Sequence, residues 1–161
     1  MTAPAIALGV LILASSTLAS DKRVEVDPKT DFSLLKTFSL EEGRASSRQP
    51  EIHNSLTLRM IENVVRTELI ARGLKETADR PDLVVTFSVT EGGQRGAPPP
   101  GQRGVLKLSA GTLIIDMTRR DMKSLVWHGV YSDVADSPGT LASRLPGGAR
   151  KLLSDFPPKK K

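Results

Sequence analysis

Several short segments of the chain alternate between apolar and polar residues, a pattern that predicts β-strands. The clearest begins at Leu83, where apolar residues take every second position and threonine or serine fills most of the gaps. Every second side chain of a strand points to the same face of a sheet, so one face of this sheet should be buried and the other polar. The predicted strands are 23–27, 37–40, 83–90, 105–118 and 124–134.

Apolar residues three and four positions apart predict one long helix at roughly Pro50–Arg72. Proline suits the first helical turn, and Glu51 suits the positive end of the helix dipole. Gly73 should end the helix, with Leu74 folding back on the last turn. The predicted apolar stripe consists of Leu56, Met60, Ile61, Val64, Val65 and Leu69.

The C-terminal region predicts a second helical part, which begins with Ser137 as a cap and Pro138 in the first turn. Proline and glycine disfavour a helix interior, so Pro146–Gly148 should divide it into two short pieces. The second piece is expected near Ala149–Asp155.

The resulting order, β-β-α-β-β-β-α, predicts an α+β fold. We expect a two-layer sandwich with a mainly antiparallel sheet of about five strands and two helices on one face. The domain should span residues 21–158, followed by a basic tail at 159–161. Two polar segments are predicted as loops: 41–49, and the Pro-, Gly- and Arg-rich stretch 91–104, which is expected to be flexible.

The first twenty residues predict an export signal. Ala5–Leu13 is an unbroken apolar run, too short to span a bilayer comfortably, and small residues follow it with a cleavage site near Thr17–Ala19. No Lys or Arg precedes the run, so a buried N-terminal segment is the alternative. The 161 residues contain no cysteine, which excludes disulfides, cysteine-bound metals and a cysteine carrying a lipid anchor.

Strands 105–118 and 124–134 should form a hairpin with 119–123 as its loop. The expected partners are Thr118 with Ser124, Asp116 with Val126 and Ile114 with His128. One face is then apolar, with Leu113, Ile115, Met117, Leu125, Trp127, Gly129 and Tyr131. The other is half polar, with Thr112, Ile114, Asp116, Thr118, Ser124, Val126, His128 and Val130.

The half-polar face carries a serine, a histidine and an aspartate, so nucleophilic catalysis has to be weighed. Ser124 and His128 lie four residues apart on one strand, roughly 13 Å, whereas a triad needs direct hydrogen bonds. Asp116 should lie diagonal to His128, at roughly 7–8 Å between backbones, which allows a contact. A surface ion pair is the simpler interpretation of such a contact, and we expect no enzyme activity.

Metal and cofactor sites also lack a signature. The only histidines are His53 and His128, and neither has a second ligand at metal-binding spacing. Trp127 and Tyr131 flank Gly129 on the apolar face, which allows either a ligand groove or room for a helix. The sequence therefore predicts no metal and no cofactor.

The net charge is +5, with basic residues dispersed at predicted loop tips and in the tail. Binding of nucleic acid would favour basic residues interleaved with aromatics, and the chain has only six aromatics. The three terminal lysines contribute about 1 kcal/mol each near an anionic membrane, which allows only weak contact with anionic lipid.

Six segments resemble a known family in their order and spacing. They are DFSLLKTF at 31–38, ELIARGL at 68–74, PDLVV at 81–85, GTLIID at 111–116, LVWHG at 125–129 and FPP at 156–158. Residues 22–158 thus resemble the bacterial domain-of-unknown-function family 4136. The resemblance implies an exported envelope protein, often a lipoprotein, without assigned activity or catalytic residues. The chain departs from the family in lacking the lipid-anchor cysteine and in the Pro146–Gly148 interruption.

The function predicted is therefore an exported, non-catalytic binding or structural accessory of the bacterial envelope, periplasmic or associated with the outer membrane. Its partner would be an envelope protein or a cell-surface component. The surface would be the exposed sheet face, near Asp116, His128, Trp127 and Tyr131, or the loop 91–104. The alternative is a small-ligand protein or hydrolase that uses Asp116 and His128 beside the Trp127–Tyr131 strand.

Overall fold

The computed structural model describes residues 20–92 and 109–158. The predicted signal segment other than Ser20, the greater part of the 91–104 loop, residues 105–108 of a predicted strand and the tail 159–161 lie outside the described residues. Glu91 and Gly92 belong to a strand and not to a loop. In the described ranges, no helix combines the length and apolar character that crossing a membrane requires.

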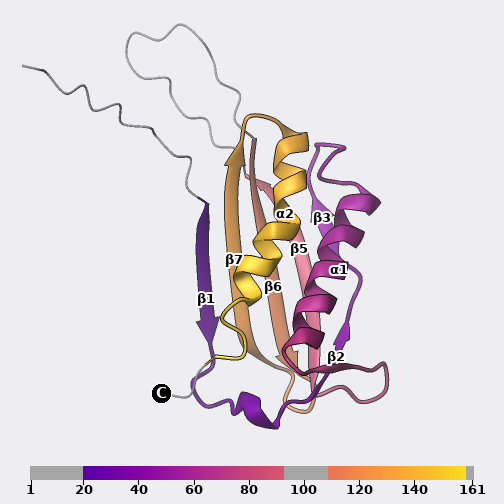
Figure 1. The fold of residues 1–161 in the computed structure, drawn as a ribbon, viewed down its shortest axis with the longest axis vertical. Helices are drawn as coiled ribbons and strands as arrows, with labels where there is room; N and C mark the ends of the chain where they lie inside the picture. The colour runs from indigo at the N-terminus through magenta and orange to yellow at the C-terminus, as the bar shows by residue number, and fades with distance from the viewer. Residues whose placement is uncertain (1–19, 93–108, 159–161) are drawn as a thin grey trace, which may run out of the picture.

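The architecture is a mixed seven-stranded sheet in the order β1-β7-β6-β5-β2-β4, with β3 also paired to β5 (Figure 1). The long strands β5, β6 and β7 form an antiparallel meander at its centre, and β1 adds antiparallel to β7. β2 and β3 run parallel to β5. The strands are β1 Asp21–Val26, β2 Thr37–Leu40, β3 Arg44–Ser46, β4 Lys75–Glu76, β5 Leu83–Gly92, β6 Ser109–Arg119 and β7 Ser124–Ala135.

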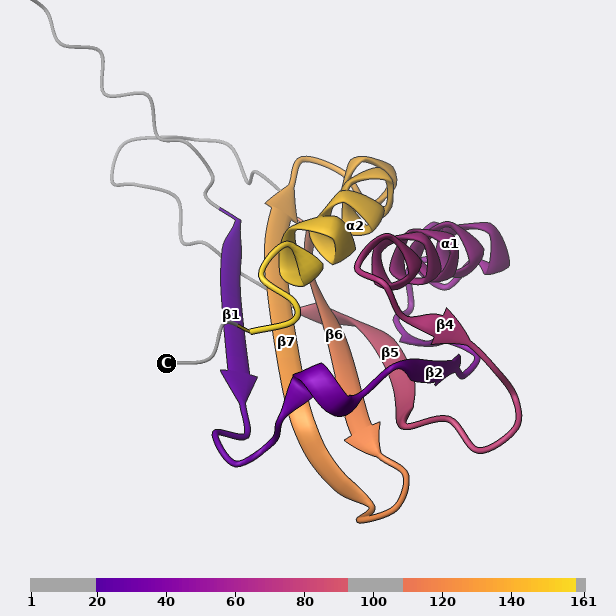
Figure 2. The same cartoon turned by 60° about the horizontal axis from the view of Figure 1, so that its bottom comes forward.

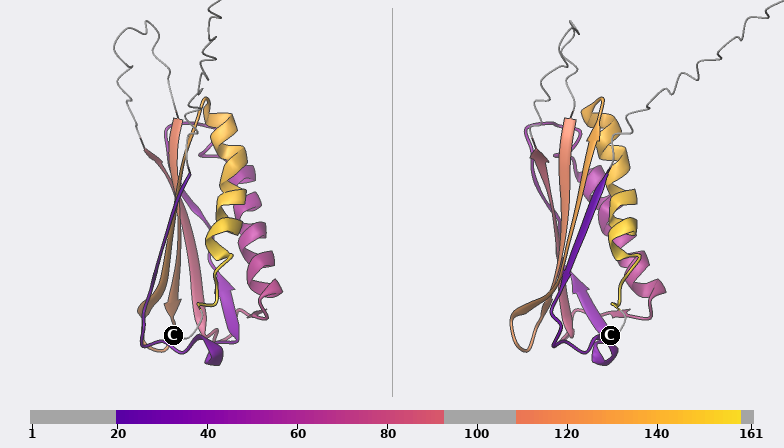
Figure 3. Two further views of the ribbon diagram at one scale, coloured as in Figure 1. Left: turned by 60° about the vertical axis from the view of Figure 1, so that its left-hand side comes forward. Right: turned by 90° about the vertical axis from the view of Figure 1, so that its left-hand side faces the viewer.

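Helices α1 (Ser55–Ala71) and α2 (Pro138–Leu153) lie side by side on one face of the sheet (Figure 2). The edge-on views of Figure 3 show no helix on the other face. The α+β two-layer fold with both helices on one face is therefore confirmed. The strand count was too low, because β3 and β4 are only three and two residues long and carry no alternating pattern.

Helix α1 begins five residues later than predicted. Asn54 caps it by accepting a hydrogen bond from the Leu56 N–H, and the residues at 50–53 form turns instead. The buried stripe consists of Thr57, Ile61, Val65 and Leu69. Leu56 and Met60 were wrongly placed in it: they are 64% and 44% exposed. Gly73 ends the helix as predicted, with φ of 88°, and Leu74 is buried.

Helix α2 is continuous, so the predicted division into two pieces is wrong. Ser137 caps it and Pro138 begins it, as expected. Pro146 lies within it and is buried against the core, and Gly148 lets the helix approach β7 closely. A Cβ atom on Gly148 would lie 2.3 Å from the ring of Tyr131. Tertiary packing thus outweighs the low helix propensity of these residues.

The lower end of the helix layer is closed by aromatic side chains. Phe156 makes edge-to-face contacts with Phe32 and Trp127, at 5.7 and 6.1 Å between ring centroids. Lys22 of β1 joins the end of α2 through the carboxylate of Asp155 and the carbonyl of Lys151. These contacts fasten the edge strand and the C-terminal helix to each other.

The adjacent glycines of α2 should respond oppositely to alanine. Gly147 is exposed and has nothing within 4 Å of an added Cβ, so Gly147→Ala should stabilise the fold by about 0.5–1 kcal/mol through helix propensity. Gly148→Ala should destabilise it by about 1–3 kcal/mol, because the methyl group overlaps the Tyr131 ring. Urea unfolding measures both changes. Equal effects would contradict the close approach of α2 to β7.

Candidate functional site

The hairpin β6–β7 positions the side chains that the sequence singled out, but its register differs from the predicted one. Arg119 pairs with Ser124, which shortens the turn, and the register then shifts between Thr118 and Met117. Val126 is the extra residue of this β-bulge, so it turns into the core and Leu125 turns out, 52% exposed. The predicted faces of Leu125 and Val126 were therefore exchanged.

The bulge places Asp116 directly opposite His128 instead of diagonal to it. His128 Nδ1 and Asp116 Oδ1 lie 2.5 Å apart, and both side chains are about one-third exposed. The predicted contact therefore forms, and it lies on the sheet face without helices. Glu25 of β1 and Thr86 of β5 extend the same row across the sheet.

No serine shares a hydrogen bond with His128 among the described residues. Ser124 pairs with Arg119 near the turn, and Ser132 instead shares a hydrogen bond of 3.2 Å with Thr112. Groups of three or more histidine and acidic side chains able to hold a metal are also absent from residues 20–92 and 109–158. The described part of the open face therefore offers a hydrogen-bonded acid and imidazole without an adjacent nucleophile.

Trp127 and Tyr131 point into the helix layer and are only 1% and 2% exposed. The gap at Gly129 is filled, because a Cβ there would lie 2.4 Å from the Trp127 ring and 3.3 Å from Leu152 of α2. Of the two interpretations of this gap, room for a helix is therefore correct. Trp127 and Tyr131 consequently do not lie on the face that carries Asp116 and His128.

The sheet face without helices is called the open face below. Its central side chains alternate strictly with buried ones and are all partly exposed. They are small or β-branched, with hydroxyl groups beside aliphatic groups. They comprise Val84, Thr86, Ser88, Thr90, Thr112, Ile114, Asp116, Thr118, His128, Val130, Ser132 and Val134.

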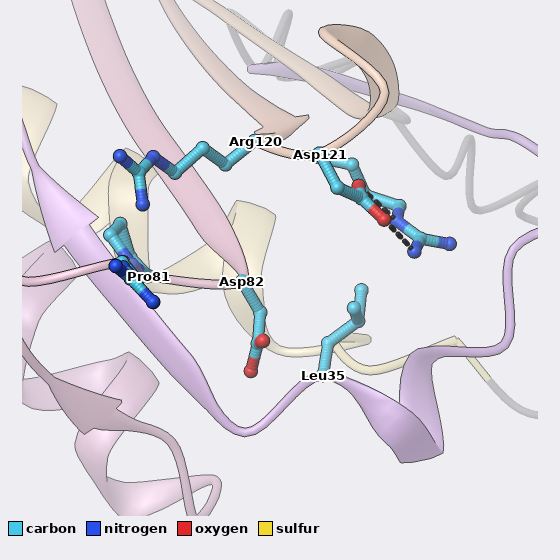
Figure 4. Close-up of a pocket in the computed structure, with 7 residues that line it drawn as sticks. Leu35, Pro81, Asp82, Arg120 and Asp121 are labelled. Carbon is cyan, nitrogen blue, oxygen red and sulfur yellow. Dashed lines mark hydrogen bonds and ion pairs between the residues drawn. The ribbon is translucent and has the colours of Figure 1, made fainter.

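A second feature lies where the β6–β7 turn meets the segment before β5. Here a cavity of about 380 Å³ is lined by Leu35, Arg80, Pro81, Asp82, Arg119, Arg120 and Asp121. Figure 4 shows the Arg120 side chain extending toward Pro81, while Asp82 points toward the segment that follows Leu35. We refer to this hollow as the arginine cavity.

Asp82 joins three segments of the chain around the arginine cavity. Its Oδ2 accepts hydrogen bonds from the N–H groups of Lys36 and Thr37 and from the Thr37 hydroxyl, at 2.8–2.9 Å. Its carbonyl accepts from the N–H of Arg120. The Lys36 N–H, followed by the donors of Thr37, lowers the pKa of Asp82 despite its partial burial.

The three arginines of the cavity differ in their partners. Arg119 is paired with Asp121, whereas Arg80 and Arg120 have no side-chain partner in the described ranges. Arg80 also has a φ of 45°, in the left-handed region that non-glycine residues seldom adopt. Arg119 and Arg120 were noted in the sequence only as part of a dispersed charge. Arg80 and Asp82 carried no signal, because their role comes from tertiary contacts.

A larger and more apolar hollow lies below β1. It measures about 800 Å³ and is lined by residues 26–33 together with Pro157 and Pro158. Phe32 is the aromatic member of this lining, and its ring packs on Phe156. The hollow is formed by the turn after β1 and the end of the chain.

These features define a two-layer α+β domain with one open sheet face and without a catalytic constellation in its described residues. The chain belongs to the family described as Domain of unknown function (DUF4136), which it matches over residues 22–158. This confirms the family resemblance. A comparison with curated proteins finds no match.

Solved structures share the fold at low sequence identity. A DUF4136 family protein from Bacteroides thetaiotaomicron is 16% identical, with a TM-score of 0.55, over 85% of this chain and 94% of its own. The PelC dodecamer from Paraburkholderia phytofirmans is 12% identical, with a TM-score of 0.50, over 84% and 97%. A neuraminyllactose-binding hemagglutinin homolog from Helicobacter pylori is 10% identical, with a TM-score of 0.53, over 79% and 88%. At these identities the likeness establishes the fold alone.

The hydrogen bonds of Asp82 predict a pH-dependent stability. The pKa of this carboxyl is lower in the folded protein than the value of about 3.9 in an unfolded chain. Its stabilising effect is therefore present above about pH 4 and is lost as the pH falls through the lower folded pKa. Asp82→Asn should cost about 1–3 kcal/mol at pH 7, and the difference from the wild type should shrink at lower pH. Urea unfolding over a pH series measures it, and a difference that stays constant contradicts the charged role.

Proposed function

We propose that this protein is a non-catalytic accessory of the bacterial envelope that binds an envelope protein or a cell-surface component through its open face. The observation that carries the proposal is the uncovered side of the central meander, where partly exposed side chains fill β5, β6 and β7. A domain with helices on one face only leaves such a surface available to a partner.

The composition of the open face supports a binding role. Aliphatic side chains such as Ile114 and Val130 lie beside hydroxyl groups of threonine and serine, so the centre combines apolar area with hydrogen-bonding groups. Charges other than Asp116 lie toward β1 and β3, at Arg23, Glu25 and Arg44. Protein interfaces commonly have few charges at the centre and a polar rim.

The envelope location is supported by the N-terminal sequence and by the family. Ala5–Leu13 has the length of a signal-peptide core and small residues follow it. One protein of similar fold is named as a homolog of a neuraminyllactose-binding hemagglutinin, and another is a dodecamer. Both favour a role in binding or assembly over a role in catalysis.

The alternative, a small-ligand protein or hydrolase built on Asp116 and His128, has less support. The two side chains contact each other on the open face, but Trp127 and Tyr131, which would line a pocket beside them, are buried under α2. The cavities described above lie elsewhere, and none has Asp116 or His128 in its lining.

In-cell crosslinking of the exported protein separates the two functions. The wild type and the double variant Asp116→Ala/His128→Ala should capture the same partner, because an exposed acid–imidazole pair contributes little binding free energy. Ile114→Arg should abolish capture by placing a long charged chain at the centre of the open face. Leu56→Arg, on the exposed side of α1, is the matched control and should leave capture unchanged.

Each result bears on the proposal. Loss of capture in the Asp116→Ala/His128→Ala variant, with its thermal stability retained, would favour the alternative. Capture by Ile114→Arg at the wild-type level would overturn the open face as the binding surface. Fractionation of the same cells tests the location, and recovery of the protein in the cytoplasm would contradict export.

A further inference from the structure

We propose that the arginine cavity is a binding site for a small anionic group, a carboxylate or a phosphate. The cavity of about 380 Å³ has the size of a small-ligand site, and three of its seven lining residues are arginines. It lies at the β6–β7 turn, and the proposal does not depend on the open face or on its partner.

The charges at the cavity are unevenly satisfied. The Asp82 carboxylate already accepts three hydrogen bonds from Lys36 and Thr37, and Asp121 pairs with Arg119 through both of its oxygens. Both aspartates are thus occupied, whereas the guanidinium groups of Arg80 and Arg120 have no partner in the described part of the chain. An incoming anion would supply the missing acceptors.

The segments that carry these arginines are fixed relative to each other. Leu83 pairs with Arg119 in the sheet, and the Arg120 N–H donates to the Asp82 carbonyl at 3.2 Å. Asp82 in turn holds the start of β2 through Thr37. Such preorganisation lowers the entropic cost of binding.

The backbone at Arg80 is a second, independent observation. Its φ of 45° is sterically unfavourable for a side chain with a Cβ atom, and asparagine or glycine would adopt it at lower cost. Strained residues of this kind concentrate at ligand sites, where the surrounding structure holds them. Buried Pro81 fixes the chain directly after it.

The chemistry of the lining selects an anion with planar or tetrahedral oxygens. Guanidinium groups donate paired N–H bonds to carboxylate and phosphate, and such charge-assisted bonds are stronger than neutral ones. Leu35 and Pro81 add an apolar wall that excludes water from part of the cavity. The group can belong to a soluble anion or to a lipid headgroup, and the experiment distinguishes these two sources.

Isothermal titration with inorganic phosphate and with citrate tests the soluble form, and sedimentation with phosphatidylcholine vesicles, with and without phosphatidylglycerol, tests the headgroup. Arg80→Asn and Arg120→Gln should each weaken binding about tenfold, the loss expected for one charge-assisted hydrogen bond. Arg80→Asn also suits the left-handed backbone, so its fold should be retained. Arg59→Gln, on the exposed surface of α1, removes one charge elsewhere and should have no effect.

Asp121→Asn provides a variant with the opposite sign. It keeps an oxygen for the Met122 N–H but removes the charge that holds Arg119, so it should tighten anion binding several-fold. A gain of affinity cannot arise from unfolding, which keeps the proposal testable if a loss variant is unstable.

The outcomes are distinguishable. Selective weakening in the two cavity variants supports the site, with phosphate or citrate binding indicating a soluble anion and vesicle binding alone indicating a headgroup. Equal weakening by Arg59→Gln would show unspecific attraction by net charge and overturn the site. Absence of binding to all four probes at millimolar concentration, or unchanged affinity in Asp121→Asn, would also overturn it.

Discussion

The close approach of α2 to β7 is the contact on which the remainder of the fold depends. Gly129 and Gly148 supply no side chains at the contact, which lets the rings of Trp127 and Tyr131 occupy the space between helix and sheet. Leu152 completes this layer. Because α1 packs beside α2 on the same face, the opposite side of the central strands receives no cover (Figure 3).

One-sided coverage separates packing from recognition in this chain. The alternation along β5, β6 and β7 sends apolar residues to the helices and small polar or β-branched residues to the open face. The β6–β7 turn extends beyond the helix layer and carries Arg119 and Arg120 to the segment around Asp82. The two surfaces proposed for binding are thus products of one architecture, and they differ in chemistry: one is a flat sheet face and the other a cationic hollow.

The sequence predicted the features that depend on regular spacing. The long strands, the α1 stripe around Ile61 and the side of Gly129 that faces a helix all follow from period and residue size. The bulge at Val126 was not predictable, because a single extra residue leaves the local pattern intact yet exchanges the faces beyond it. The continuity of α2 through Pro146 depends on tertiary burial, which no local propensity contains.

The candidate sites show the same limit. The contact between Asp116 and His128 was predicted from strand geometry, although the bulge changed a diagonal pair into a direct one. The arginine cavity was not predicted, because Arg80 and Arg120 are distant in the sequence and the left-handed backbone of Arg80 has no glycine or asparagine to signal it.

Labelling of introduced thiols measures most directly whether the open face is the surface a partner covers. The natural chain has no cysteine, so Ile114→Cys on the open face and Ile115→Cys under the helices report each face separately. In the purified protein a maleimide should modify the first thiol quickly and the second only after unfolding. In intact cells the thiol at position 114 should become protected. Labelling at the same rate in cells as in the purified protein would contradict a partner on this face.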